Sequence, residues 1–190
     1  MLTTLIAAAA FGFSGPQPPL HCPATLEEIT GAPAITMEYG GALYGTCCGG
    51  CDGPFLKDPK GLIAKAIKAN KTVGAFEYDP VSGAKIDAKK AAAFSDYKAV
   101  RYYFAKDDEK AKFDAKPASF VADVKSESQS CPVSGKKMAN DSAGAYADYS
   151  GVRYYFCCTD CEAKFKADPA KFAASASAST HPLVAVTVKK

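Results

Sequence analysis

Histidine is scarce in this sequence, and the usual signatures of an enzyme are missing with it. The 190 residues include only two histidines, His21 and His181. No Ser-His-Asp arrangement, glycine-rich phosphate loop or zinc-protease motif occurs, and no acid–base pair stands out. We therefore expect a protein that is not an enzyme, in which either histidine could still serve as a metal ligand.

A concentrated run of basic residues is also missing. Lysine and arginine total 23 against 20 acidic residues, which gives a net charge of +3, and they are scattered along the chain. Nucleic-acid-binding proteins usually gather their positive charge on one face. We therefore expect no nucleic-acid partner.

Long apolar runs are absent as well. The N-terminal stretch MLTTLIAAAAFGFSG at 1–15 is apolar over about twelve residues, too few to span a bilayer. Its small residues resemble a signal-peptide cleavage region, although no Lys or Arg precedes them. We expect 1–15 to be a signal peptide and the mature protein to be periplasmic or extracellular, without stable membrane insertion. The alternative is a buried N-terminal helix or strand in a cytoplasmic protein.

Cysteine is absent from the middle of the chain, and this gap falls within a repeat. One segment occurs three times, from Cys22 to Pro59, from Asp79 to Phe120 and from Cys131 to Phe172. The second and third copies align without a gap at an offset of 52 residues and share VRYYF at 100–104 and 152–156. All eight cysteines fall in the outer copies, four in each. This ordered agreement indicates duplication.

Each copy is expected to be α+β, with a tight turn that carries the first cysteine or its substitute, then a β-hairpin, then a helix. In the last copy we expect strands at 145–149 and 152–156, joined by a Ser-Gly turn. Thr159 or Asp160 is expected to cap the helix, which Asp168-Pro169 interrupts before a second helical turn. Aromatic residues at matching positions are expected to form the core: Tyr102, Phe104, Phe113 and Phe120 in the second copy, and Tyr154, Phe156, Phe165 and Phe172 in the third.

The rest of the chain is expected to link these modules. Residues 126–130 and 173–180 are polar or of low complexity and are expected to be linkers. Residues 183–188 (LVAVTV) are expected to form a strand that adds to a neighbouring sheet. The expected organisation is a signal peptide at 1–15, modules at 20–72, 73–126 and 127–177, and a tail at 178–190.

Modules of about 50 residues bury little surface and usually need a metal, disulfides or a packed neighbour. The middle copy keeps the aromatic positions but has Asp79, Ala105 and Glu109 where cysteines stand in the last copy. Two carboxylates without a third ligand make a poor cation site. We expect the middle module to be a spacer held by its aromatic core.

The cysteine spacing predicts two thiolate metal sites. Twenty-five residues separate Cys131 from Cys157, twenty-four separate Cys22 from Cys47, and another cysteine follows each pair. A strand end that runs into a helix start brings the sulfurs of Cys-x-x-x-Cys together, and the cysteine on the turn closes the site. The helix N-terminus also favours the thiolate form. The candidate ligands are Cys22, Cys47, Cys48, Cys51, Cys131, Cys157, Cys158 and Cys161.

This pattern resembles the YHS family and the related TRASH metal-binding modules. The resemblance is carried by the CPVSG turn, the YYFC strand end, Cys157 with Cys161, Phe165 and the Asp-Pro pair at 168–169. It covers nearly all of 20–175 as three modules, and it implies a compact hairpin and helix that bind zinc or copper. The first copy departs from the pattern at 26–28 and 44–46, and many family members carry the first cysteine where this chain has Ser134.

The identity of the metal stays open, and so does the role of the thiols. Structural zinc takes four ligands, so Cys158 as a fourth ligand would favour zinc, whereas three sulfurs would favour copper(I). The cysteines could instead form stabilising disulfides in a structural or interaction protein, or exchange disulfides through their Cys-x-x-Cys pairs. We expect metal buffering, sensing or delivery, with metal ions as partners and another metal-handling protein as a further candidate.

Overall fold

The structure is a computed structural model of the chain, and it describes residues 17–137, 142–176, 180–182 and 187–189. The expected signal peptide at 1–15 and residues 183–186 of the expected C-terminal strand lie outside the described residues. Among the helices of these ranges, none combines the length and the apolar character needed to cross a membrane.

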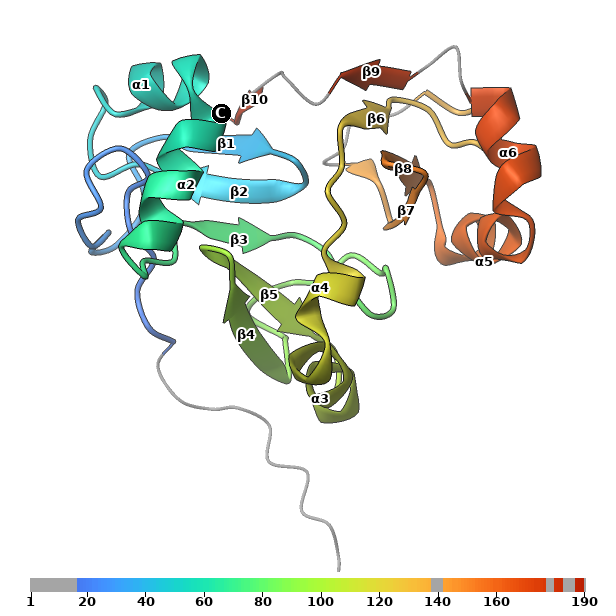
Figure 1. Cartoon of the computed structure of the whole chain (residues 1–190), viewed down its shortest axis with the longest axis horizontal. Helices are drawn as coiled ribbons and strands as arrows, with labels where there is room; N and C mark the ends of the chain where they lie inside the picture. Colours follow the sequence, from blue (N-terminus) through green and yellow to red (C-terminus); the bar gives the residue numbers. More distant parts are fainter. Residues whose placement is uncertain (1–16, 138–141, 177–179, 183–186, 190) are drawn as a thin grey trace, which may run out of the picture.

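A β-hairpin followed by two helices occurs three times along the described chain (Figure 1). The first unit (20–72) contains β1 (Thr36–Tyr39), β2 (Ala42–Gly45), α1 (Asp52–Lys57) and α2 (Pro59–Lys68). The second unit (73–125) contains β4 (Ala93–Tyr97), β5 (Val100–Phe104), α3 (Asp107–Ala115) and α4 (Pro117–Phe120). The third unit (126–176) contains β7 (Ala145–Tyr149), β8 (Val152–Phe156), α5 (Thr159–Ala167) and α6 (Pro169–Ala176). The predicted α+β class is confirmed, and so are both strands of the third hairpin.

A proline opens the second helix of every unit, at Pro59, Pro117 and Pro169. Proline has no N–H to donate and its φ is already helical, so it suits the first position of a helix and ends the one before it. The predicted helix break at Asp168-Pro169 therefore has counterparts in all three units.

Two short strands that precede the hairpins were missed from the sequence. β3 (Gly74–Phe76) runs antiparallel to β2 and parallel to β5, which joins the first two units in one sheet. β6 (Ser126–Ser128) runs parallel to β8 in the same way. The prediction of a linker at 126–130 was therefore wrong at 126–128. The polar side chains of β6 are hydrogen-bonded within the fold. Glu127 accepts a hydrogen bond from the Tyr155 hydroxyl, and the Ser128 hydroxyl donates one to the Ser130 carbonyl.

The C-terminal tail contributes a strand to each sheet of the described chain. β9 (Thr180–Pro182) pairs with β6, and β10 (Thr187–Lys189) pairs with β1. The sheet orders are β10-β1-β2-β3-β5-β4 and β7-β8-β6-β9, and Figure 1 shows β9 beside β6 and β10 beside β1. The expected strand at 183–188 is thus seen at Thr187 and Val188. The expected linker at 173–180 was wrong at 173–176, where three alanines and Ser175 continue α6.

The same aromatic pair forms the centre of each unit. A helix phenylalanine lies against a strand tyrosine at a ring-centroid distance of 4.8 Å for Phe55 and Tyr44, 5.1 Å for Phe113 and Tyr102, and 4.9 Å for Phe165 and Tyr154. The predicted core residues of the second and third copies are buried, except Phe120 and Phe172, which are partly buried against the same clusters.

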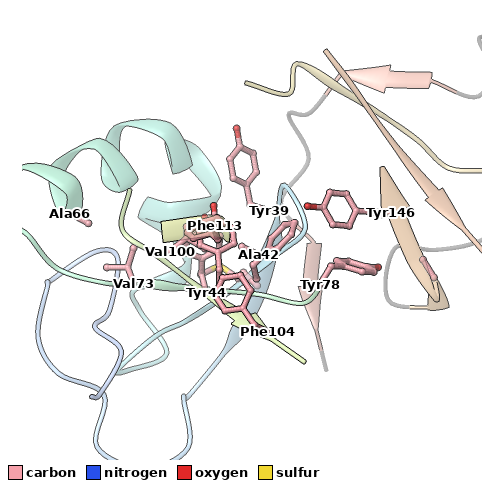
Figure 2. Close-up of a cluster of buried hydrophobic side chains, with 14 of the residues drawn as sticks. Tyr39, Ala42, Tyr44, Ala66, Val73, Tyr78, Val100, Phe104, Phe113 and Tyr146 are labelled. Atoms are coloured by element: carbon pink, nitrogen blue, oxygen red, sulfur yellow. The ribbon is translucent and has the colours of Figure 1, made fainter. Parts of the chain in front are cut away.

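The opposite face of the third hairpin packs on the rest of the molecule. Tyr146 lies 5.2 Å from the ring centroids of both Phe76 and Tyr78, and Tyr155 lies 5.9 Å from Tyr78. Figure 2 shows Tyr78 and Tyr146 side by side in this cluster. Side chains alternate between the two faces of a strand. One face of the VRYYF strand β8 therefore packs in the core of the third unit, and the other face packs against the rest of the molecule.

A buried arginine completes this attachment. Arg153 donates to Asp148 through Nε and Nη2, each at 2.8 Å, and its Nη1 donates to the Gly40 carbonyl in the hairpin turn of the first unit. The guanidinium also lies 4.9 Å from the ring centroids of Phe76 and Tyr146. Arg101 makes the equivalent pair with Asp96 in the second unit and donates to the Pro18 carbonyl.

Replacing Arg153 with alanine is expected to lower the free energy of unfolding by about 3–5 kcal/mol, because it leaves Asp148 and the Gly40 carbonyl without their buried partner. Urea unfolding followed by circular dichroism measures the change. The control is Lys110→Ala, which breaks the exposed pair with Asp114 and should cost less than about 1 kcal/mol. Equal losses in the two variants would contradict the role given to Arg153.

Candidate metal centre

A tight turn positions the first candidate ligand of each outer unit. In the third unit the N–H of Gly135 donates to the Cys131 carbonyl at 2.8 Å, and the N–H of Cys131 donates to Lys136 at 2.9 Å. Gly135 has a φ of +71°, a conformation that glycine adopts without strain. Leu26 takes its place in the first unit with a φ of +65° and donates to the Cys22 carbonyl at 2.8 Å. The turn is therefore kept where the sequence departs from the family pattern.

The third unit brings three of its four cysteines together. Cys157 follows β8, Cys161 lies in the first turn of α5, and their sulfurs are 3.7 Å apart. With Cys131, which is fully buried, they form a set whose sulfurs all lie within 4.8 Å of one another. Cys158 is exposed and lies outside this set.

The predicted N-cap of α5 was wrong. The helix begins at Thr159, and Cys158 is its N-cap with an extended backbone. Cys157 contributes its sulfur to the three-sulfur set, whereas the exposed Cys158 hydrogen-bonds to Cys161 from outside that set.

The first unit repeats this arrangement. The sulfurs of Cys22, Cys47 and Cys51 lie within 4.8 Å of one another, with 3.7 Å between those of Cys47 and Cys51. Cys22 is fully buried, whereas Cys48 is exposed and outside the set. Unlike Cys161, Cys51 precedes its helix, as the N-cap of α1.

A hydroxyl lies beside each site. The Oγ1 of Thr25 is 3.6 Å from the Cys47 sulfur, and the Oγ of Ser134 is 3.6 Å from the Cys157 sulfur. Thr25 and Ser134 occupy the same position in their turns. The sequence indicated that this position lies beside the site, because Ser134 stands where many YHS members carry their first cysteine.

Backbone N–H groups surround the sulfur of the first cysteine. Burial raises the pKa of the Cys131 thiol, but the Ser134 hydroxyl and the N–H groups of Cys157, Ser134 and Val133 outweigh this and lower it to about 7. At Cys22 burial is opposed in the same way by the N–H groups of Cys47, Thr25 and Ala24, and the pKa is again about 7. The thiolate, which is the form that binds metals, is therefore favoured near neutral pH.

Four further cysteines have shifted thiol pKa values, and the direction of the shift depends on their place. Hydrogen bonding to Cys48, then burial, raises the pKa of Cys51, and burial, then hydrogen bonding to Cys158, raises that of Cys161. Hydrogen bonds lower the pKa of the exposed Cys48 and Cys158. A cation bound at either cluster would displace the protons that its thiols hold.

In the middle unit a carboxylate takes the place of the first thiolate. Asp79 is buried, and its Oδ1 accepts from the N–H groups of Val81 at 2.9 Å and Ser82 at 3.3 Å, while Oδ2 accepts from Ala105 at 3.0 Å. These three N–H groups correspond to those around Cys131. The sequence contained this signal too, because a change from Cys to Asp replaces one anion with another.

The other ligand positions of the middle unit do not rebuild a site. Ala105 has no ligand atom, and Glu109, at the position of Cys161, is buried with no hydrogen-bond partner for its Oε2 in the structure. Within the described ranges, the potential metal-ligand groups with three or more members are the two cysteine sets. His21 is in neither set, because its ring contacts the Thr72 carbonyl and the Lys71 ammonium. The side chain of His181 lies outside the described residues.

Two clusters of cysteines that could bind a metal are thus the chemical feature of this fold. A family model described as the YHS domain matches residues 130–176, which include the complete sulfur set of the third unit. The predicted resemblance is confirmed for this part of the chain, and the metal-binding character of that family agrees with the cluster. No curated protein and no solved structure matches the chain.

The middle unit is expected to make stability depend on pH through Glu109. Burial, followed by the charge of Asp79, raises the pKa of the Glu109 carboxyl, so the folded state keeps a proton that the unfolded chain loses above about pH 4. The free energy of unfolding should therefore fall as pH rises through the folded pKa. Glu109→Gln stays neutral and should remove this decrease in urea titrations between about pH 4 and about pH 7. The exposed Glu28, changed to Gln, is the control, and a Glu109→Gln profile parallel to that of the wild type would contradict this account.

Proposed function

We propose that this protein binds copper(I) at two three-thiolate sites, one formed by Cys22, Cys47 and Cys51 and the other by Cys131, Cys157 and Cys161. The observation that carries the proposal is the convergence of these three sulfurs in two separate parts of the chain, within 4.8 Å in each set. Soft thiolate ligands select soft ions, and copper(I) accepts three of them.

The number of sulfurs favours copper over zinc. A structural zinc ion takes four ligands, and the fourth cysteine of each unit lies outside the converging set. Zinc is the second candidate because the Cys48 sulfur is only 3.1 Å from that of Cys51, so a small movement would complete a four-sulfur site.

We also propose that all three units are YHS modules and that the middle one has lost its ligands. The equivalent turns, the proline at the start of each second helix and the repeated Phe–Tyr contact support this view. In this proposal the outer modules buffer or deliver the metal in an exported protein, and the middle module joins them.

Copper content tests the proposal. The wild type, reconstituted anaerobically with copper(I), is expected to bind two ions per chain by elemental analysis, one for each cysteine set. Changing Cys157 and Cys161 together to serine should remove one ion, because a single remaining thiolate does not hold copper against a competing ligand.

The matched control is Cys158→Ser, which should still bind two copper ions; loss of one there would favour a four-sulfur zinc-type site. Protein that carries no metal and shows no free thiols when denatured without reductant would contradict the proposal and favour structural disulfides.

Rebuilding the middle site tests the equivalence of the three units. The combined changes Asp79→Cys, Ala105→Cys and Glu109→Cys keep the surrounding N–H groups and supply three sulfurs, so copper content should rise from the two cysteine sets of the wild type by one further ion. The variant with Ala105→Cys alone is the control and should show no increase. An unchanged content in the triple variant would contradict the equivalence.

A further inference from the structure

Each three-sulfur set has a fourth thiol beside it, and the two fourth thiols differ in how firmly they are held. Cys48 and Cys158 are both exposed, whereas Cys22 and Cys131 are fully buried. The inference below rests on the proposed function, because it assigns a task to Cys48 at the first of the proposed sites.

In the third unit the fourth thiol is fixed at a helix start. Cys158 is the N-cap of α5, Thr159 and Asp160 are already helical, and Cys161 lies within the helix. The sulfur of Cys158 is 4.0 Å from that of Cys157. A change in the backbone direction at Cys158 would disturb the first turn of α5, which starts at the next residue.

In the first unit the corresponding segment is not helical. Gly49 and Gly50 separate Cys48 from Cys51, and α1 begins only at Asp52. A Cβ atom added at either glycine would meet no atom within 4 Å, so this turn lies in open space. Glycine also has more backbone freedom than any other residue. The backbone at Cys48 is therefore freer to change direction than the backbone at Cys158.

Cys48 is also close to the site. Its sulfur is 3.1 Å from that of Cys51, nearer than the 3.7 Å between Cys47 and Cys51. An ion bound to Cys51 at a metal–sulfur distance of about 2.3 Å would lie within reach of Cys48. The exposed thiol is thus placed between a bound ion and the solvent.

We propose that the first site is an exchange site, in which Cys48 takes the metal ion from Cys22 and presents it at the surface, while the third site retains its ion. In this step the bond between the ion and the Cys22 sulfur breaks as a bond to the Cys48 sulfur forms, and the ion stays bound to Cys51. Cys48 releases its thiol proton to water, Cys22 remains a thiolate among its three N–H donors, and no electrons are transferred. The acceptor that this geometry fits is a protein or peptide that offers exposed thiolates to a soft ion.

Metal transfer from the intact protein tests this proposal. Protein loaded with copper(I) is mixed in a stopped-flow instrument with bathocuproine disulfonate, which is coloured when it binds copper(I). The wild type should release its copper in two phases of equal amplitude, one for each site. Cys48→Ser should still bind two copper ions, but its fast phase should slow by about tenfold or more, since each factor of ten reflects about 1.4 kcal/mol in the barrier.

Two variants serve as matched controls. Gly49→Thr combined with Gly50→Asp introduces the residues of the third unit, and the open space around both glycines accommodates them. This double variant should slow copper release from the first site to the rate of the third site, while the copper content stays the same. Cys158→Ser should leave the fast phase unchanged.

The proposal is overturned if the wild type releases copper in one phase, if the fast phase survives in Cys48→Ser, or if that variant loses an ion and so shows Cys48 to be a resident ligand. A wild type that binds no copper instead refutes the proposed function first, and the exchange site with it.

Discussion

A buried acidic side chain that accepts hydrogen bonds from three backbone N–H groups is the interaction on which each unit depends. The donors come from the tight turn and from the segment just after the second hairpin strand, so the buried acceptor ties two parts of the unit together. In the outer units the acceptors are Cys22 and Cys131, whose thiol pKa is lowered to about 7, and in the middle unit the acceptor is the side chain of Asp79. Burying a charge without such donors is costly, and the middle unit has an acid at this position although Ala105 and Glu109 stand where the third unit has Cys157 and Cys161.

Features set by neighbouring residues were predictable from the sequence, and those set by distant partners were not. The third hairpin and the helix break at Asp168-Pro169 follow from alternating aromatic residues, a Ser-Gly turn and a proline, all of which act locally. β3 and β6 have three residues each, and β6 is polar, so their strand character comes from the strands beside them.

The candidate site shows the same division. The cysteine spacing indicates which residues are available, but the selection of three sulfurs from four depends on the backbone direction at Cys158 and on the glycines after Cys48. The contact of Arg153 could not be predicted from the sequence, because its Gly40 partner lies 113 residues away in the chain.

The shared sheet of the first two units and the aromatic cluster around Tyr78 join the units in one folded body, whereas the sequence predicted separate modules joined by linkers.

The pairing of β1 with β10 has a consequence for how the chain folds. Thr36 pairs with Lys189 across almost the whole described sequence, and contacts between such distant residues close slowly because the loop between them must be ordered first. Until β10 arrives, β1 presents a free edge, and free edges accept strands from other molecules. The edge of the first unit therefore depends on the last strand of the chain for its cover, and β1 stays open to pairing until β10 is in place.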